Sequence, residues 1–226
     1  MLNLLIMGKP GAGKGTQSER LLKHYQLEHI STGNIYREEI QKQSAIGIEA
    51  QKYISQGELV PDDLTNSIVR DVLTNHSFEQ GFMLDGYPRT TAQAVALDKM
   101  LTEFNMPLTA VINVQVSDHV LLERMAGRRV CPKCNATYHI KNHPPKEACV
   151  CDVCGTRLIQ RADDLEDSVL NRLRIYNEKT KPLLDYYRHR HLLMVVDGTK
   201  SSDDVFDDIV RKLGEHYGHH QVTKRN

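Results

Sequence analysis

The nine residues Gly8-Lys9-Pro10-Gly11-Ala12-Gly13-Lys14-Gly15-Thr16 decide the fold of this 226-residue chain. They follow the apolar run 2–7 and match the pattern G-x-x-x-x-G-K, in which glycines let successive backbone N–H groups face phosphate oxygens. A helix over residues 15–25 would add its positive end, and Lys14 would add a full positive charge. The stretch therefore predicts a phosphate-binding loop between a buried strand and a helix.

Short apolar runs alternate with longer amphipathic stretches, which is typical of an α/β protein with a parallel sheet. We expect strands at residues 2–7, 28–30, 81–85, 110–116 and 192–197. Helices are expected at 15–25, after a cap at Ser31 or Thr32, from Pro61, at 91–101, at 167–190, and after caps at Ser117 and at Ser201 or Ser202. The fold class is therefore a doubly wound five-stranded parallel sheet with helices on both faces and a ligand site at the carboxyl ends of its strands.

The charge balance bears on the partners of the protein. The 29 basic side chains equal the 29 acidic ones, so no overall field favours nucleic acid or an anionic membrane. No run approaches the roughly 20 apolar residues that span a bilayer, and residues 1–7 are too short and too poor in basic residues for a signal peptide. We expect a cytoplasmic protein without nucleic-acid or membrane partners. The polar tail after Gly218, with His219, His220, Lys224 and Arg225, is expected to fray.

All five cysteines lie between residues 131 and 154, in a proline-containing segment (128–164) without a convincing helix. Cys131-x₂-Cys134, sixteen residues and Cys151-x₂-Cys154 fit a closed four-thiolate zinc site of structural rather than catalytic type. Two disulfides, a vacant site, or iron or cobalt in place of zinc are the alternatives. Cys149 falls outside the C-x-x-C spacing. His139 and His143 are interpreted as solvated loop histidines.

Five short motifs occur in the order and at the spacing of one family. They are Gly11-Ala12-Gly13-Lys14-Gly15-Thr16-Gln17, Ser31-Thr32-Gly33, Asp85-Gly86-Tyr87-Pro88-Arg89, Gly127-Arg128-Arg129 and Arg161-x-Asp163-Asp164. From residue 2 to about residue 213 the chain resembles the adenylate kinases, and its long insert resembles their zinc-carrying bacterial branch. The resemblance implies reversible phosphoryl transfer from ATP to AMP giving two ADP, with Mg²⁺ as cofactor and a monomeric enzyme.

The resemblance also implies roles for individual residues. ATP would be bound by Gly11, Ala12, Gly13, Lys14, Gly15 and Thr16, and by Arg128, Thr137, Tyr138 and Lys200. AMP would be bound by Thr32, Arg37, Glu58, Leu59, Val60, Gly86, Tyr87, Pro88, Arg89, Gln93, Arg161 and Arg172, with Gln93 at the adenine edge, where an amide both donates and accepts. The catalytic set would be Lys14, Arg89, Arg124, Arg128, Arg161 and Arg172, and Asp85 would hold Mg²⁺ through water.

The chemistry of the residues agrees with these roles. Phosphoryl transfer needs two nucleotides in line, neutralised charge and little water, and a planar guanidinium grips phosphate at two points. Asn34 departs from the family, which often has aspartate after Ser-Thr-Gly, so the water shell of Mg²⁺ would be weakened or displaced. Asp163 and Asp164 are interpreted either as ion-pair partners at the hinge of the lid or as charges at a helix N-terminus.

The chain is expected to comprise a core with the phosphate loop (1–30), an AMP-binding helical insert (31–60), further core (61–126), a zinc-ribbon-like lid (127–164), and core with a C-terminal tail (165–226). Residues 31–60 and 127–164 would close over the substrates. Two other functions compete with this one. The first is the same chemistry on UMP or CMP. The second is a nucleotide-sensing regulator whose cysteine ribbon reads nucleic acid, which the neutral charge disfavours.

Overall fold

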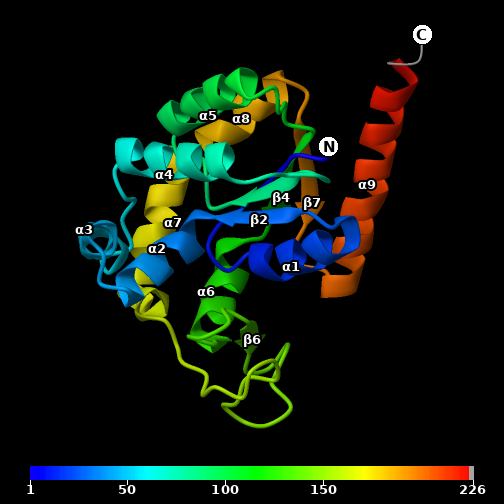
Figure 1. The fold of residues 1–226 in the computed structure, drawn as a ribbon. Helices are drawn as coiled ribbons and strands as arrows, with labels where there is room; N and C mark the ends of the chain where they lie inside the picture. The colour runs from blue at the N-terminus through cyan, green and yellow to red at the C-terminus, as the bar shows by residue number, and fades with distance from the viewer. Residues whose placement is uncertain (224–226) are drawn as a thin grey trace.

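A five-stranded parallel sheet forms the centre of the protein in this computed structural model, which describes residues 1–223 (Figure 1). The strand order is β2 (Glu28–Ser31), β3 (Phe82–Asp85), β1 (Leu4–Met7), β4 (Ala110–Gln115) and β7 (Leu193–Asp197). All neighbouring strands run parallel, as alternating strands and crossover helices require. The predicted doubly wound α/β fold and its five strands are confirmed.

Helices cover both faces of the sheet because the strands are apolar on both sides. Leu4 and Ile6 of β1 pack with α1 (Lys14–Tyr25), α6 (Asp118–Gly127), α7 (Glu166–Ile175) and α9 (Ser202–Thr223). Leu5 and Met7 point the other way, towards α4 (Asp62–Asn75), α5 (Thr91–Glu103) and α8 (Pro182–His189). Figure 1 shows α4, α5 and α8 together on one side of the strands, with α1 and α6 on the other. The central strand β1 thus carries the phosphate loop out of the most enclosed part of the core.

Two smaller units project from the sheet on the side of its carboxyl ends. The first is formed by α2 (Thr32–Gln41) and α3 (Ala45–Ile54), which share a small core with α4. The second, here called the cysteine lobe, is residues 127–164, with an antiparallel pair of short strands, β5 (Arg128–Val130) and β6 (Thr137–His139), and a 3₁₀ turn at Ala162–Asp164. The two units touch, since Gln41 Nε2 donates to Pro132 O at 3.1 Å. The division into five segments stays a prediction.

The predicted helix caps have mixed outcomes. Ser31 Oγ accepts from Asn34 N at 3.4 Å and Ser201 Oγ from Asp204 N at 3.2 Å, which confirms both caps. Ser117 occupies the cap position of α6, but its side chain accepts no hydrogen bond from the helix, so that cap prediction is wrong. Pro61 lies one position before α4 rather than in its first turn.

The uninterrupted helix predicted over 167–190 is wrong in its middle. The chain forms α7, a wide π-helical turn (η2, Tyr176–Thr180) and then α8. Pro182 has no N–H, and its ring would clash with the carbonyl of an ordinary preceding turn, so this turn widens. Lys181 N accordingly donates to Tyr176 O, five residues back, at 2.8 Å. The helical segment keeps its length but is interrupted by one wider turn.

The tail prediction is wrong for residues 219–223, because α9 continues to Thr223. Residues 219–223 contain neither glycine nor proline, so nothing in their composition ends the helix. Lys224 and Arg225 lie outside the described residues. Within residues 1–223, no helix has both the length and the apolar composition that a membrane crossing requires.

Candidate active site

The phosphate loop connects Met7, the last residue of β1, to Lys14, the first of α1. Gly8 has a φ of 146°, and a Cβ there would lie 2.6 Å from the carbonyl oxygen of Val114. Gly13 has a φ of 96° at the position that caps α1, where no side chain supplies the cap. The first N–H groups of α1 are therefore left for a ligand, which is the arrangement that binds phosphate. This confirms the predicted strand–loop–helix order.

The ammonium group of Lys14 is folded back over this loop. Its Nζ donates to Gly8 O at 2.8 Å and to Lys9 O at 3.0 Å. Burial lowers the pKa of Lys14 from 10.5 to about 7; Asp85 acts in the opposite direction, and Arg89 and two further arginines lower the pKa again. A bound phosphate would supply the negative charge that this ammonium group lacks.

Asp85 ends β3, next to the phosphate loop, because Ile6 of β1 pairs with Asp85 in the parallel register. His29 Nε2 lies 3.8 Å from Asp85 Oδ2. Burial by itself would raise the pKa of Asp85, but its interaction with the neighbouring His29 and the charge of Lys14 hold it below its ordinary value. An ionised carboxylate facing the cavity fits the hard-cation chemistry of Mg²⁺.

A cavity of about 900 Å³ opens in front of the loop and extends to the cysteine lobe. It brings together residues from all parts of the chain that were predicted to bind ATP. Its walls include Gly11, Ala12, Gly13, Lys14, Gly15, Thr16, Arg124, Arg128, Thr137, Tyr138, Arg161, Arg172 and Lys200. The space is of the size that holds a small-molecule ligand.

Five guanidinium groups gather where this cavity meets the α2–α3 unit; they belong to Arg37, Arg89, Arg128, Arg161 and Arg172. Two of them have carboxylate partners: Arg172 Nη1 lies 2.7 Å from Asp163 Oδ2, and Arg128 pairs with Asp164. Asp163 and Asp164 are thus ion-pair partners at the lobe's edge, which was one of the two interpretations of these residues.

Arg161 carries the least compensated of these charges. Its buried Nε has no hydrogen-bond partner in the part of the chain that the structure describes. Burial, together with the neighbouring charges of Arg37 and Arg128, lowers its pKa to about 9. Burial likewise lowers the pKa of Arg172 to about 10, although Asp163 opposes the shift. The cluster is therefore short of negative charge, which phosphate groups would supply.

A second, narrower pocket lies between the α2–α3 unit and the end of β3. It is lined by most of the residues predicted for AMP: Thr32, Arg37, Glu58, Leu59, Val60, Gly86, Arg89, Gln93 and Arg172. Its lining combines the guanidinium groups of the three arginines with the apolar side chains of Ile54, Leu59 and Val60. Such a pocket suits a ligand with an anionic tail and a flat ring.

Three residues predicted for AMP lie outside the lining of that pocket. Tyr87 is buried, and its hydroxyl donates to Asn66 Oδ1 at 2.6 Å. Pro88 is buried next to it, and Arg161 faces the larger cavity instead. Tyr87 and Pro88 hold the Gly86–Arg89 segment in place, and their direct contact with AMP stays a prediction.

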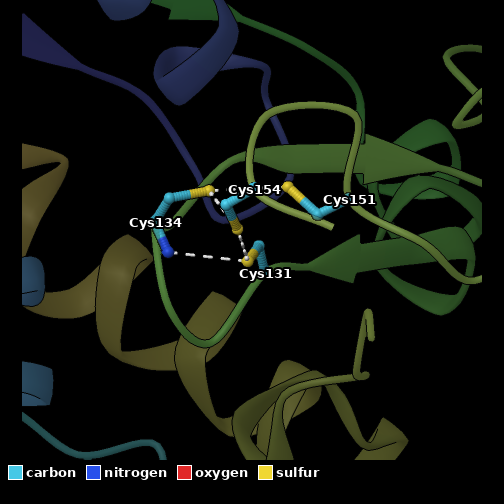
Figure 2. A group of neighbouring side chains, drawn as sticks. All are labelled: Cys131, Cys134, Cys151 and Cys154. Atoms are coloured by element: carbon cyan, nitrogen blue, oxygen red, sulfur yellow. Dashed lines mark hydrogen bonds between the residues drawn. The ribbon is translucent and has the colours of Figure 1, made fainter. Parts of the chain in front are cut away.

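The sulfur atoms of Cys131, Cys134, Cys151 and Cys154 all lie within 4.8 Å of one another (Figure 2). The shortest separations are 3.4 Å between Cys131 and Cys154 and 3.5 Å between Cys134 and Cys151. Tetrahedral zinc with Zn–S bonds of about 2.3 Å would separate sulfurs by about 3.8 Å, so the arrangement fits the ion. The separations are far longer than an S–S bond, and all five cysteines are free.

The two C-x-x-C loops have the same backbone geometry. Cys131 N donates to Ala136 O and Cys151 N donates to Thr156 O, both at 2.9 Å. The residue after each second cysteine, Asn135 or Gly155, has a positive φ of 61° or 69°. Two equivalent turns thus present two sulfurs each, whereas Cys149 is exposed and outside the group.

Tyr138 joins this cysteine group to the large cavity. Its hydroxyl lies 3.5 Å from Cys151 Sγ and accepts from Asp152 N at 2.8 Å. Its ring stacks on His143, with centroids 5.7 Å apart and planes at 9°. His143 also lines the large cavity and stays exposed there, which agrees with its interpretation as a solvated loop residue.

Sequence reasoning missed three residues of the site: His29 beside Asp85, His143 on Tyr138, and Asp62, whose carboxylate binds the Gln93 amide at 2.7 Å. None of the three belongs to a motif. Pairing of distant segments brings His29 and Asp62 into place, so no sequence spacing could have revealed them. His143 reaches Tyr138 through the local turn that pairs it with His139.

Comparison with known proteins agrees with the geometry. The family model described as adenylate kinase matches residues 6–192. The chain is 50% identical over 212 residues to the adenylate kinase of Caldanaerobacter subterraneus subsp. tengcongensis, covering 94% of this chain and 96% of that one. It is 47% identical to the adenylate kinase of Thermoanaerobacter sp. (strain X514), covering 95% and 99%. It is 48% identical to that of Clostridium novyi, covering 92% and 96%. Two nucleotides that face each other need a phosphate loop, an arginine cluster short of negative charge, and a second pocket beyond that cluster. The chain belongs to the adenylate kinase family, and it transfers a phosphoryl group reversibly from ATP to AMP to give two ADP.

Proposed function

We propose that the two cavities hold ATP and AMP with their phosphates facing each other across the arginine cluster. The observation that carries this proposal is the position of Arg89 and Arg172, which line both cavities. A guanidinium group at the junction can contact both the transferred phosphoryl group and its acceptor, so it stabilises charge as it moves. Charge neutralisation and alignment are then the main work of the site, because this transfer needs little covalent chemistry.

ATP occupies the large cavity in this proposal. The N–H groups of residues 11–16 surround its β- and γ-phosphates, and Lys14 leaves the carbonyls of Gly8 and Lys9 to bind them. Arg124 and Arg128 approach the phosphates from α6 and β5. Thr137, Tyr138 and Lys200 contact the nucleoside from the wall that carries the stacked Tyr138 and His143 rings.

AMP occupies the narrow pocket, with its phosphate beside the arginines. Arg37, Arg89 and Arg172 bind that phosphate from the pocket wall, and Arg161 reaches it from the larger cavity. Thr32 and Gly86 pack beside the ribose, where Thr32 Oγ1 donates to Gly86 O at 3.1 Å. The adenine ring lies between Glu58, Leu59 and Val60 on one side and Gln93 on the other.

Mg²⁺ accompanies ATP in this enzyme family. We assign Asp85 as the carboxylate that holds the water shell of the ion, because it is ionised and faces the phosphate loop. Asn34 offers no second carboxylate: its Oδ1 accepts a hydrogen bond from Arg37. When bound there, Mg²⁺ would neutralise part of the phosphate charge.

The four cysteines hold zinc as a structural ion, which makes residues 127–164 a rigid lid. This lid and residues 31–60 close over ATP and AMP and exclude water, and their contact between Gln41 and Pro132 belongs to the closed arrangement. The enzyme acts as a cytoplasmic monomer.

A coupled assay with AMP, UMP, CMP and GMP as acceptors, together with hydrogen exchange, tests these assignments. AMP should be the preferred acceptor, and an analogue that joins two adenosines through a phosphate chain should protect both 31–60 and 127–164 from exchange. Preference for UMP or CMP, or protection of the phosphate loop alone, would contradict the proposed sites.

A further inference from the structure

Asp62, the first residue of α4, lies beside the narrow pocket without lining it, and both of its carboxylate oxygens are engaged. Oδ1 accepts from Gln93 Nε2 at 2.7 Å, and Oδ2 accepts from Thr90 Oγ1 at 2.8 Å. Gln93 itself is buried and lines the pocket. We infer that Asp62 fixes which way round the Gln93 amide is held, and thereby makes the pocket accept adenine and reject hypoxanthine and guanine. This inference rests on the proposed binding of AMP at Gln93.

Two partners of opposite kind determine the orientation of the amide. A carboxylate only accepts hydrogen bonds, and it faces Nε2; a backbone N–H only donates, and that of Arg89 reaches Gln93 Oε1 at 2.7 Å. Turning the amide over would place its oxygen against the carboxylate of Asp62 and its NH₂ group against the N–H of Arg89. Both contacts would become repulsive, so the amide has one stable orientation.

Thr90, at the start of the neighbouring helix α5, fixes the position of Asp62. Thr90 caps α5, since its Oγ1 accepts from Gln93 N at 3.1 Å while its hydroxyl hydrogen goes to Asp62. The hydroxyl of Tyr87 lies 3.2 Å from Gln93 O. The start of α4 and the start of α5 are therefore tied together at the point where the amide is oriented.

An amide held in this way has one N–H and one oxygen lone pair left for a ligand. The Watson–Crick edge of adenine offers a donor at N6 and an acceptor at N1, which match these two groups. The edge of hypoxanthine, like that of guanine, offers an acceptor at O6 and a donor at N1, so donor meets donor and acceptor meets acceptor. A site whose polar groups are left opposed or unpaired discriminates strongly.

The first test uses the unaltered enzyme and three acceptors: AMP, purine riboside 5′-monophosphate and IMP. The purine riboside lacks the 6-amino group and so loses one hydrogen bond, whereas IMP reverses both. We expect kcat/KM to fall from AMP to the purine riboside, and to fall at least tenfold further to IMP. IMP acting as well as the purine riboside would mean that the amide turns freely, and would overturn the inference.

The second test compares Asp62→Asn with Asp63→Asn, its exposed neighbour in the first turn of α4. The amide introduced at position 62 can pair with either orientation of Gln93, so the ratio of kcat/KM for AMP to that for IMP should fall at least tenfold, or about 1.4 kcal/mol. Asp63→Asn removes the same charge from the helix and should leave the ratio unchanged. An equal loss with both acceptors in Asp62→Asn would show a merely structural role and overturn the inference.

Gln93→Ala separates the inference from the assignment of the pocket. If kcat/KM for AMP is unaffected in this variant, the base does not lie at Gln93, and the assignment and the inference both fail. If it falls while Asp62→Asn keeps the ratio of the unaltered enzyme, the assignment stands and the inference alone fails.

Discussion

The sheet and the cysteine lobe are held together in different ways. The sheet packs two large apolar cores, one on each face, which together take in side chains from all five strands and seven helices. The core of the lobe consists of Cys131, Tyr138, Cys151 and Leu158, so half of its members are thiols. A segment with so little apolar surface to bury needs another source of free energy, and four converging sulfurs can provide it by binding a metal ion. The sheet is thus maintained by apolar burial, whereas we propose that the cysteine lobe is maintained by metal coordination.

Removing one sulfur should break the lobe and leave the sheet intact. Apparent zinc binding in comparable small sites amounts to ~10 kcal/mol or more, far above what the lobe's apolar contacts supply. In Cys131→Ser we expect loss of bound metal and loss of hydrogen-exchange protection in residues 127–164, with protection of β1 and β4 retained. Metal content measured by mass spectrometry and peptide-level exchange check this. Cys149→Ser is the matched control, and it should keep both the metal and the protection.

A cavity in the core of the sheet should destabilise the sheet and leave the cysteine lobe intact. Leu97 on α5 is fully buried, so Leu97→Ala should lower the global unfolding free energy by about 3 kcal/mol through lost burial and a cavity. Its neighbour Val95 is 41% exposed, and Val95→Ala should change stability by less than about 1 kcal/mol. Denaturant titration measures both. Retained zinc in Leu97→Ala is expected, and loss of zinc at native conditions would contradict the independence of the two regions.

The pKa of Lys14 gives the smallest effect and reports on the junction of the two regions. In the unfolded chain its pKa is near 10.5, and burial lowers it to about 7 in the fold, where Arg128 of the lobe also contributes. Between these values the unfolded state binds more protons, so stability rises with pH. Relative to Lys14→Met, the unliganded enzyme should gain ~2 kcal/mol from pH 7 to pH 9. Thermal unfolding of both proteins across this range checks the prediction, and a constant difference would refute it.

Local sequence patterns predicted those parts of the molecule that depend on neighbouring residues. Gly8, Gly11 and Gly13 supply the positive φ angles that the phosphate loop needs, and each C-x-x-C turn closes within six residues. The strands were predictable because each is a short apolar run buried on both faces. The π-helical turn before Pro182 was not, since a helical pattern records which face is apolar but not how a missing N–H is accommodated.

The partners of the site residues were not predictable for a different reason. His29 meets Asp85 only because β2 and β3 pair in a given register, and Asp62 meets Gln93 only because α4 and α5 start side by side. Such contacts are set by the packing of whole elements, and a single sequence does not record that packing.

Tyr138 links the cysteine group to the wall of the large cavity. Its hydroxyl is bound at the cysteine group and its ring forms part of the wall of the large cavity. Any tilt of the two C-x-x-C turns therefore moves an aromatic surface that contacts the nucleoside in the proposed complex. The cysteine group therefore also determines the shape of the cavity wall. Oxidation of its sulfurs would first distort the surface that is proposed to contact ATP.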